Sequence, residues 1–245
     1  MNNNKTVLTI GQAAQKLGVS IETLRRWDKK ATFIALRKNA AGHRYYDKQK
    51  VEQLLIERKD IFALAYRWIF EKPQEPDLSF YCPTALEFKI QLIKFEKRVS
   101  ELHDARDYYP LIVAATGEIG NNSFDHNSGN WPDITGIFFG FSIKKREVVL
   151  VDRGRGILQT LKQVRPSLKN DTEALYTAFT ETISGRAPEA RGNGLKFVRE
   201  AVTKTPMRLF FQTGSAVLHL TQGDTVLRIK NSDTYLRGCL AKISF

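Results

Sequence analysis

Apolar residues recur at spacings of three and four over residues 10–17, which predicts a short helix with one buried face. Gly18 suits the tight turn that follows, and Ser20 is a preferred N-cap for a second helix over residues 20–28. That second helix carries two adjacent arginines near its end. Two helices joined by one tight turn are typical of a helix-turn-helix.

The segment that follows alternates basic and aromatic residues around a glycine. It reads Arg37-Lys-Asn-Ala-Ala-Gly-His-Arg-Tyr-Tyr-Asp47, with Gly42 at its centre. Glycine adopts the backbone conformations that tight turns require, so we expect a β-hairpin with its tip at Gly42. A helix-turn-helix followed by such a hairpin is a winged helix.

These two parts together resemble the winged helix of MerR-type regulators, over about residues 6 to 56. The sequence Leu24-Arg-Arg-Trp-Asp28 is also similar to the DNA-binding domains of excisionases and some transposon resolvases. The resemblance implies binding to double-stranded DNA; the alternative is a basic winged helix that binds protein. The residues that it places against DNA are Thr23, Arg25 and Arg26 in the recognition helix and Arg37, His43, Arg44 and Tyr45 in the wing.

Positive charge is concentrated in the same region. Residues 1–72 contain 15 Lys and Arg against 7 Asp and Glu, or +8, whereas the remaining residues contain 23 against 19, or +4. Lysine and arginine neutralise DNA phosphates, which makes affinity fall with salt, while base contacts supply specificity. The distribution of charge therefore favours DNA binding by the N-terminal region.

The middle of the chain alternates between helical and linker patterns. Residues 48–70 are expected to form one or two helices that complete a first domain, residues 1–70, and residues 71–84 to form a linker. Residues 85–104 predict an amphipathic helix, which either pairs with a second protomer in a homodimer or packs on the sheet of its own domain. Its apolar stripe consists of Phe88, Leu92, Phe95, Val99 and Leu102.

Three polar residues share one face of an otherwise apolar helix further along. Glu118, Asn122 and His126 are four residues apart, and they follow the buried-type run Leu111-Ile-Val-Ala-Ala115. An amide oxygen suits Mg²⁺, and a carboxylate one turn earlier is placed to orient or deprotonate a water. The pattern predicts either a site for a metal-nucleotide complex or a solvent-facing stripe.

A strand and a glycine-rich turn come next. The apolar run over residues 148–151 predicts a buried strand that ends at Asp152, and Gly154 and Gly156 would let the backbone approach a ligand closely. An Asp at a strand end can accept a hydrogen bond from an exocyclic amine such as that of adenine. A plain turn has the same composition.

A second glycine-containing segment, Gly192-Asn193-Gly194, precedes a stretch with helical spacing that starts at Leu195. The N–H groups at the start of a helix, together with its dipole, bind anions. This segment therefore predicts a phosphate site.

Together the three segments resemble the N box and the two glycine boxes of the GHKL ATPase superfamily, which includes gyrase B subunits, heat-shock chaperones and sensor histidine kinases. The resemblance covers roughly residues 105 to 245 and implies binding of ATP and Mg²⁺. It implies that Asn122 ligates Mg²⁺, that Asp152 holds the adenine amine and that Glu118 is a general base. Residues 157–191 correspond to an ATP lid, and Arg191 stands where a further glycine is frequent. The other cofactor-binding residues that it implies are His126, Gly154, Gly156, Arg191, Gly192, Asn193, Gly194 and Leu195.

The expected fold class is α+β: a winged helix-turn-helix followed by an α/β-sandwich Bergerat domain, residues 105–245, with a mixed, mainly antiparallel sheet. Four short β-rich runs after residue 206 are expected as its closing antiparallel strands. The chain lacks a long apolar run and has only two cysteines, Cys82 and Cys239. We therefore expect a soluble protein of the bacterial cytoplasm whose cysteines are structural thiols.

These motifs predict an ATP-responsive DNA-binding regulator, in which Mg-ATP in the second domain modulates DNA binding or a partner interaction. Two alternatives from the enzyme class stay open. One is a protein kinase that resembles the anti-sigma-factor kinases and phosphorylates a small protein partner encoded nearby. The other is an ATPase of a toxin-antitoxin, phage-defence or mobile-element module with autoregulatory DNA binding.

Overall fold

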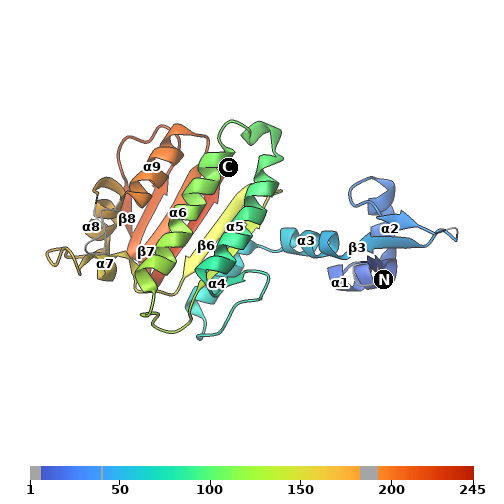
Figure 1. The fold of residues 1–245 in the computed structure, drawn as a ribbon, viewed down its shortest axis with the longest axis horizontal. Coiled ribbons are helices and arrows are strands. Elements are labelled where there is room, and N and C mark those ends of the chain that lie inside the picture. The colour runs from blue at the N-terminus through green and yellow to red at the C-terminus, as the bar shows by residue number, and fades with distance from the viewer. Residues whose placement is uncertain (1–6, 40, 183–192) are drawn as a thin grey trace. The chain divides into compact units, whose positions relative to one another are not determined.

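The computed structural model describes residues 7–39, 41–182 and 193–245. It divides the chain into two compact units, Met1–Asp60 and Ile61–Phe245, which are described separately (Figure 1).

The first unit is a winged helix. Its helix-turn-helix begins with a capping box between Thr9 and Gln12, turns at Gly18 with a φ of 62°, and restarts at Ser20, whose side chain caps the second helix. The sheet has the order β1-β3-β2, with both pairs antiparallel, and β2 and β3 form the wing. The elements of this unit are β1 (Val7–Thr9), α1 (Ile10–Leu17), α2 (Ile21–Lys29), β2 (Arg37–Lys38), β3 (Arg44–Asp47) and α3 (Lys48–Arg58).

A small core holds these elements together. Leu24 of α2 and Tyr46 of β3 are fully buried, and the Tyr46 ring stacks on Phe33 with centroids 5.4 Å apart. The Tyr46 hydroxyl also donates to the carbonyl of Leu24. The recognition helix and the wing are therefore fixed to each other from inside the unit.

The second unit is built on a five-stranded sheet of order β4-β5-β6-β8-β7. Every neighbouring pair in the described residues is antiparallel, so the expectation of a mixed sheet is wrong for this part of the chain. For the β5–β6 pair the reason lies in the connection of four residues, since so short a connection cannot join parallel strands. The strands are β4 (Tyr81–Cys82), β5 (Ile137–Ser142), β6 (Glu147–Asp152), β7 (Arg208–Leu220) and β8 (Ile229–Ser244).

The closing part of the sheet consists of two long strands, whereas the sequence suggested four short ones. The β7–β8 register shifts at Thr213/Gly214 and again before Ala216, and Gly214 has a φ of 55°. A bulge of this kind bends a strand without ending it. The glycine that suggests a turn in the sequence therefore lies within a continuous strand.

Helices cover both faces of the sheet. Figure 1 shows α5, α6 and α9 side by side across one face, and their mutual contacts agree with that view. The opposite face is covered by α4, as the alternation along β5 shows: Phe139 contacts Phe88 of α5, whereas Phe138 packs near Trp68 of α4. The helices are α4 (Ile61–Phe70), α5 (Ala85–Ser100), a 3₁₀ turn (His103–Ala105), α6 (Tyr109–Asn127), α7 (Gly156–Leu161), α8 (Asp171–Thr180) and α9 (Gly194–Lys204).

The position of α4 corrects the expected domain boundary. Residues 61–70 belong to the second unit and not to a first domain of residues 1–70. Ile61, Ala65 and Trp68 of α4 are buried. The helix covers a face of the sheet that would otherwise expose apolar side chains to water. Part of the expected linker is also structured, since Phe80 is buried on Phe138 and β4 pairs with β5.

The apolar stripe of α5 packs on its own sheet. Phe88 and Phe95 are fully buried and both contact Phe139 edge-on. The helix starts at Thr84, which forms a capping box with Glu87. Of the two roles that the sequence leaves open for this stripe, the structure shows packing within the unit.

Candidate functional site

In the first unit, the recognition helix and the wing enclose a concave, mostly charged surface. Arg25 and Arg26 are exposed on α2, and Arg25 lies 3.3 Å from the Glu22 carboxylate. Thr23 is half-buried, and its N–H donates to the Ser20 hydroxyl. The hollow measures about 630 Å³ and is lined by Ser20, Glu22, Thr23, Arg25, Arg26, Asp28, Lys29, Lys38 and Arg44.

A buried carboxylate joins the two sides of this surface. Asp28, at the end of α2, accepts hydrogen bonds from Arg44 Nε at 2.7 Å and from the backbone of Ala35 at 3.0 Å, and Lys38 Nζ lies 2.8 Å away. The bond to Lys38, followed by the Ala35 amide, holds the pKa of Asp28 well below its usual range. Arg44, a predicted DNA contact, is thus also part of the clamp that positions the wing.

The outer part of the wing carries exposed basic groups. The Arg37 guanidinium lies over the Tyr45 ring, 5.0 Å from its centroid, and Arg37 is exposed. At the tip, Gly42 has a φ of 77° and the N–H of His43 donates to Asn39 Oδ1 at 2.8 Å. The predicted wing residues therefore lie on one hairpin, which presents Arg37 and His43 to solvent.

In the second unit, Asp152 ends β6 in a buried position. Its Oδ2 accepts from the Ser123 hydroxyl of α6 and its Oδ1 from the Gly154 amide, each at 2.8 Å. Burial is the main cause that raises the pKa of Asp152 to about 6, against the lowering effect of these donors. The carboxylate is fixed between a helix and a glycine turn.

The glycine turn after β6 lies against α6. A Cβ on Gly154 would lie 2.2 Å from Nδ2 of Asn127, whose Oδ1 accepts from the Arg155 amide at 2.9 Å. Gly156, with a φ of 75°, opens α7. Both predicted glycines are thus positions where a side chain would be blocked or strained.

The third predicted segment, which contains Gly194, also lies against α6, closer to the start of that helix than the glycine turn. A Cβ on Gly194, at the start of α9, would lie 2.6 Å from Glu118 Oε2 and 3.4 Å from Asn122 Nδ2. Asn193 precedes the helix and its side-chain oxygen accepts from Thr182, while Leu195 lies in the first turn. The structure therefore brings Glu118, Asn122 and Gly194 together; Arg191 and Gly192 lie outside the described residues.

His126 lies at the same end of α6 as the glycine turn. Its carbonyl accepts from Arg155 Nη2 at 2.9 Å, and the residue is half-buried. Burial, followed by the charge of Arg155, lowers the pKa of the imidazole. The ring is therefore favoured in its neutral form.

A buried arginine links the strand end to α4. Arg153 Nη1 donates to the carbonyls of Trp68, Ile69 and Glu71 at 2.7, 3.0 and 3.1 Å, which lie at or just after the end of that helix. Its guanidinium also forms a salt bridge with Asp133, which is shared with Arg237. Arg153 directly follows Asp152, so the Asp152 strand end is connected through one residue to α4.

Sequence reasoning missed several of these residues. Ser123 and Asn127 are four apart on α6, one position beyond Asn122 and His126, so they form a second polar line beside the predicted one. That spacing is a signal that the sequence contains. Arg153 and Asp28 have no such signal, because their partners are distant in sequence.

Comparison with known proteins bears on the first unit. Residues 9–46 match the family of MerR family regulatory proteins. The match supports the prediction of a MerR-like helix-turn-helix DNA-binding domain in the N-terminal region. A search of curated proteins gave no match. Among the described helices, none combines the length and the apolarity needed to cross a membrane.

Proposed function

We propose that the chain is a DNA-binding regulator whose second unit binds Mg-ATP, and that nucleotide binding changes the affinity for DNA or for a partner. The MerR-type domain supports the first half of this proposal. The second half depends on the geometry around α6, which touches both glycine-containing segments.

The observation that carries the nucleotide proposal is the convergence of three distant segments on α6. Ser123 contacts Asp152, and Glu118 and Asn122 lie against Gly194, within two turns of one helix. Asp152 accepts from Ser123 and Gly154 and also interacts with Cys239, and because a carboxylate has about four lone-pair sites, we infer that it can also accept from the exocyclic amine of adenine.

The start of α9 suits the phosphates. None of the described side chains caps this helix, so its first N–H groups are free to bind an anion, and its first residue, Gly194, lies beside Glu118 and Asn122. The described residues contain no cluster of three or more His, Cys, Asp or Glu placed to hold a metal. Mg²⁺ would therefore be held by Asn122 together with phosphate oxygens and water, as is usual for this ion in nucleotide sites.

Arg153 would connect the proposed nucleotide site, through α4, to the segment of chain that leads to the DNA-binding unit. It follows Asp152 and holds the last carbonyls of α4, and only Lys59 and Asp60 separate α4 from α3 of the first unit. A nucleotide that shifts the end of β6 would pull on α4 through these hydrogen bonds. A tenfold preference of ATP for one of two conformations corresponds to only about 1.4 kcal/mol. A small difference between the contacts that ATP makes in the two conformations is therefore enough to shift their populations.

The test is a pair of measurements on the full chain. Calorimetric titration with ATP and Mg²⁺ should show binding that Asp152→Asn weakens at least tenfold, since the amide places a donor where an acceptor is needed. Duplexes selected from a random pool should then bind with a different affinity when a non-hydrolysable ATP analogue is present. Equal DNA affinity with and without the analogue, at saturating nucleotide, would remove the regulatory proposal but leave ATP binding intact.

A second candidate function, phosphoryl transfer or hydrolysis, is favoured by the position of Glu118. Its carboxylate lies where the phosphate-facing end of α9 begins, which suits activation of a water or of an acceptor hydroxyl. We expect Glu118→Ala to abolish release or transfer of the γ-phosphate while ATP binding persists. Transfer to a small partner protein would identify a kinase, and release to water an ATPase.

A further inference from the structure

A hollow of about 880 Å³ opens beside the C-terminal end of α6, apart from the proposed nucleotide site. Phe124 and Ser128 line it, and the helical period of 3.6 residues per turn places them on roughly the opposite side of α6 from Asn122 and His126. The hollow is therefore a separate feature of the second unit. It is lined by Ala85, Phe124, Asp125, Ser128, Gly129, Trp131 and Thr135.

Two aromatic rings form the apolar wall of the hollow. Phe124 is buried, and the Trp131 ring packs against it edge to face, with centroids 6.1 Å apart. Phe124 lies in turn against Phe88 of the core, at 6.2 Å. Trp131 is half-buried, so part of the residue is left open to the hollow that it lines. An indole face is the best aromatic partner for a cation.

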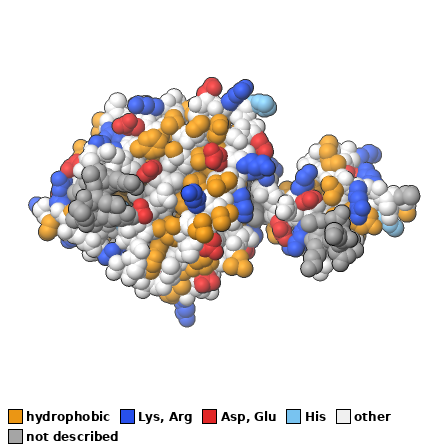
Figure 2. Space-filling view, in the orientation of Figure 1, with side chains coloured by type: hydrophobic (Ala, Val, Ile, Leu, Met, Phe, Trp, Pro, Cys, Tyr) orange, Lys and Arg blue, Asp and Glu red, His pale blue; other side chains and the backbone are white. Residues whose placement is uncertain are grey.

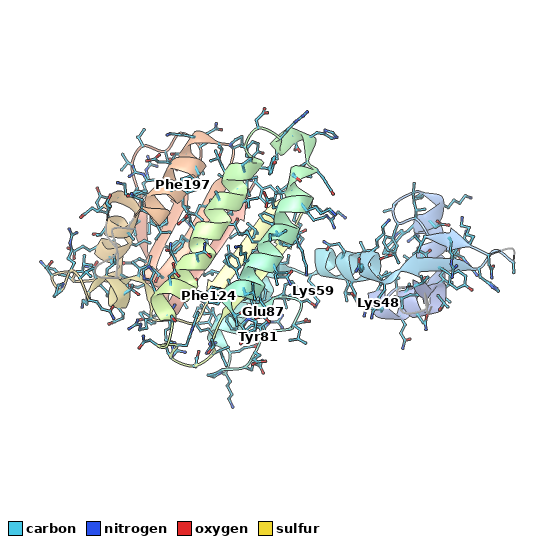
Figure 3. The ribbon with its side chains drawn as sticks, viewed as in Figure 1. Lys48, Lys59, Tyr81, Glu87, Phe124 and Phe197 are labelled. Carbon is cyan, nitrogen blue, oxygen red and sulfur yellow. The ribbon has the colours of Figure 1, made fainter. Side chains whose placement is uncertain are left out.

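The charged groups around this hollow are negative. Asp125 is exposed at its edge, and none of the described residues that line it is Lys, Arg or His. A second hollow, at the start of α5, is lined in part by Glu75, Tyr81 and Glu87. Figure 3 shows Phe124 at the same end of the second unit as Tyr81 and Glu87, and Figure 2 shows acidic and hydrophobic side chains side by side on this face. In a chain of net charge +12, such a surface attracts cations.

The loop that closes the hollow, residues 128–136, is held at several points. Gly129 begins it with a φ of 70°, and the Tyr81 hydroxyl donates to the Thr135 carbonyl at 2.7 Å. Asp133, between them, forms a salt bridge with the buried Arg153. These contacts fix the wall of the hollow before a ligand arrives, which lowers the entropy cost of binding.

The open shape of the hollow suits a side chain of another protein better than a small molecule. Asp125, Ser128, Gly129 and Thr135 are exposed, whereas small-molecule pockets bury most of the ligand surface. A planar guanidinium can stack on an indole and bind a carboxylate through two N–H groups, which an ammonium cannot do. Asp125 already interacts within the chain, but a carboxylate has about four lone-pair sites and accepts further donors.

We propose that this hollow binds an arginine side chain of a partner protein, with the guanidinium over the Trp131 ring and hydrogen-bonded to Asp125. The segment that carries the arginine is basic, because the carboxylates of Glu75 and Glu87 lie at the same end of the unit. This site does not depend on nucleotide binding, since it uses the other side of α6.

Fluorine NMR of the full chain, labelled with 5-fluorotryptophan, tests the site. The chain has three tryptophans, and the signal that disappears in Trp131→Phe belongs to Trp131. We expect the capped peptide Gly-Arg-Gly to shift this signal with a dissociation constant of about 1 mM, and Gly-Lys-Gly and Gly-Gln-Gly to bind at least roughly threefold more weakly. Equal binding of the three peptides, or no shift with Gly-Arg-Gly at tens of millimolar, would overturn the proposal.

A pair of charge variants tests the role of the carboxylate. Asp125→Asn should weaken binding of Gly-Arg-Gly roughly three- to tenfold, because a charge-assisted pair is lost. Asp107→Asn is the matched control, since Asp107 is an exposed carboxylate of the same unit that does not line the hollow. If both variants weaken binding equally, only the net charge matters and the site is wrong. Circular dichroism that matches wild type shows that each variant is folded.

A displayed peptide library tests whether a protein segment is the occupant. Selection on the wild-type chain, after removal of peptides that bind Asp125→Asn, should enrich arginine-containing peptides. The best of them should bind at least tenfold more tightly than Gly-Arg-Gly, because residues beside the arginine add contacts. Enriched peptides without arginine would contradict the proposal. A Trp131 signal that shifts when the wild-type chain alone is concentrated would assign the hollow to a second copy of the chain, and would also overturn it.

Discussion

The Ser123 hydroxyl donates a 2.8 Å hydrogen bond to the Asp152 carboxylate, and both side chains are buried although 29 residues separate them. The bond joins α6 to the end of β6, the two elements that carry most of the proposed nucleotide pocket. It holds the carboxylate in one orientation, so that the group is positioned before a ligand arrives. Losing the bond should affect both folding and binding.

Removing this hydroxyl should destabilise the second unit and weaken nucleotide binding. We expect Ser123→Ala to lower the free energy of unfolding by about 1–3 kcal/mol, because a buried carboxylate oxygen loses its donor. Ser128→Ala is the control, since Ser128 is exposed at the end of the same helix and its loss should cost less than about 0.5 kcal/mol. Urea unfolding measures both. Equal midpoints for the two variants would contradict the role assigned to Ser123.

Nucleotide binding should depend on pH through Asp152. Burial raises its pKa to about 6, so the proportion of ionised carboxylate falls about tenfold between pH 7 and pH 5. Since the ionised form is the better acceptor for an amine, we expect the affinity for Mg-ATP to fall by up to about tenfold over this range. Titration calorimetry at each pH measures this change in affinity. Asp152→Asn is the reference, because any pH dependence that comes from protonation of the ATP itself remains in the variant. An identical pH profile in the variant would exclude Asp152 as its source.

The raised pKa of Asp152 also determines the direction in which the stability of the folded state changes with pH. The folded pKa lies above the ordinary value of 3.8, so the folded state binds more protons than the unfolded state between about pH 4 and pH 6. The contribution of Asp152 to stability therefore falls as pH rises through this window and is constant above it. Asp152→Asn should remove that slope from the pH dependence of the unfolding free energy.

Two glycines that lie against side chains of α6 should respond differently to alanine. At Gly194 the new methyl would meet the end of the Glu118 side chain, which can move, so we expect a stability change below about 1 kcal/mol. At Gly154 it would meet the buried Asn127 amide, and we expect a loss of about 1–3 kcal/mol. Gly194→Ala should nevertheless weaken Mg-ATP binding at least tenfold, because Glu118 is displaced and the approach to α9 is narrowed. If Gly194→Ala binds Mg-ATP with the affinity of the wild type, the phosphates do not bind at the start of α9.

The sequence predicts local features of this fold better than long-range ones. Capping residues and turn glycines such as Ser20 and Gly18 act within four residues, so the helix-turn-helix could be located from the sequence. The run over residues 61–70 is apolar nearly all round and fits any hydrophobic surface. Which surface it covers depends on the sheet, and this is why α4 was expected in the wrong unit.

In the proposed nucleotide site, too, local features can be predicted from the sequence and long-range contacts cannot. Asp152, Gly154 and Gly194 are recognisable because strand ends and helix starts have local signatures. Arg153 is not, because its role comes from carbonyls more than 80 residues earlier. A buried salt bridge between distant residues has no sequence pattern, since either partner alone resembles an ordinary surface charge.

The clamp at Asp28 should control DNA binding without contacting DNA. Asp28→Asn keeps the shape but removes the charge that holds Lys38 and Arg44, and we expect about 1–3 kcal/mol of destabilisation of the first unit. DNA affinity should fall because the wing is no longer fixed, while the salt dependence stays close to wild type. Arg26→Ala, by contrast, should lower both the affinity and the slope of its dependence on log salt by about one. Anisotropy titrations at several salt concentrations separate the two effects, and a wild-type affinity for Asp28→Asn would refute the clamp.

Arg153 should be required for communication and dispensable for nucleotide binding. Arg153→Lys keeps the positive charge, but one ammonium cannot hold three carbonyls and Asp133 in the planar arrangement of the guanidinium. We therefore expect Mg-ATP affinity within about threefold of wild type, while the effect of nucleotide on DNA affinity is lost. Arg237→Lys is the matched control, because Arg237 shares Asp133 but makes none of the three bonds to the end of α4. DNA-binding curves with and without the ATP analogue decide the matter: a full response in Arg153→Lys would mean that the signal does not pass through α4.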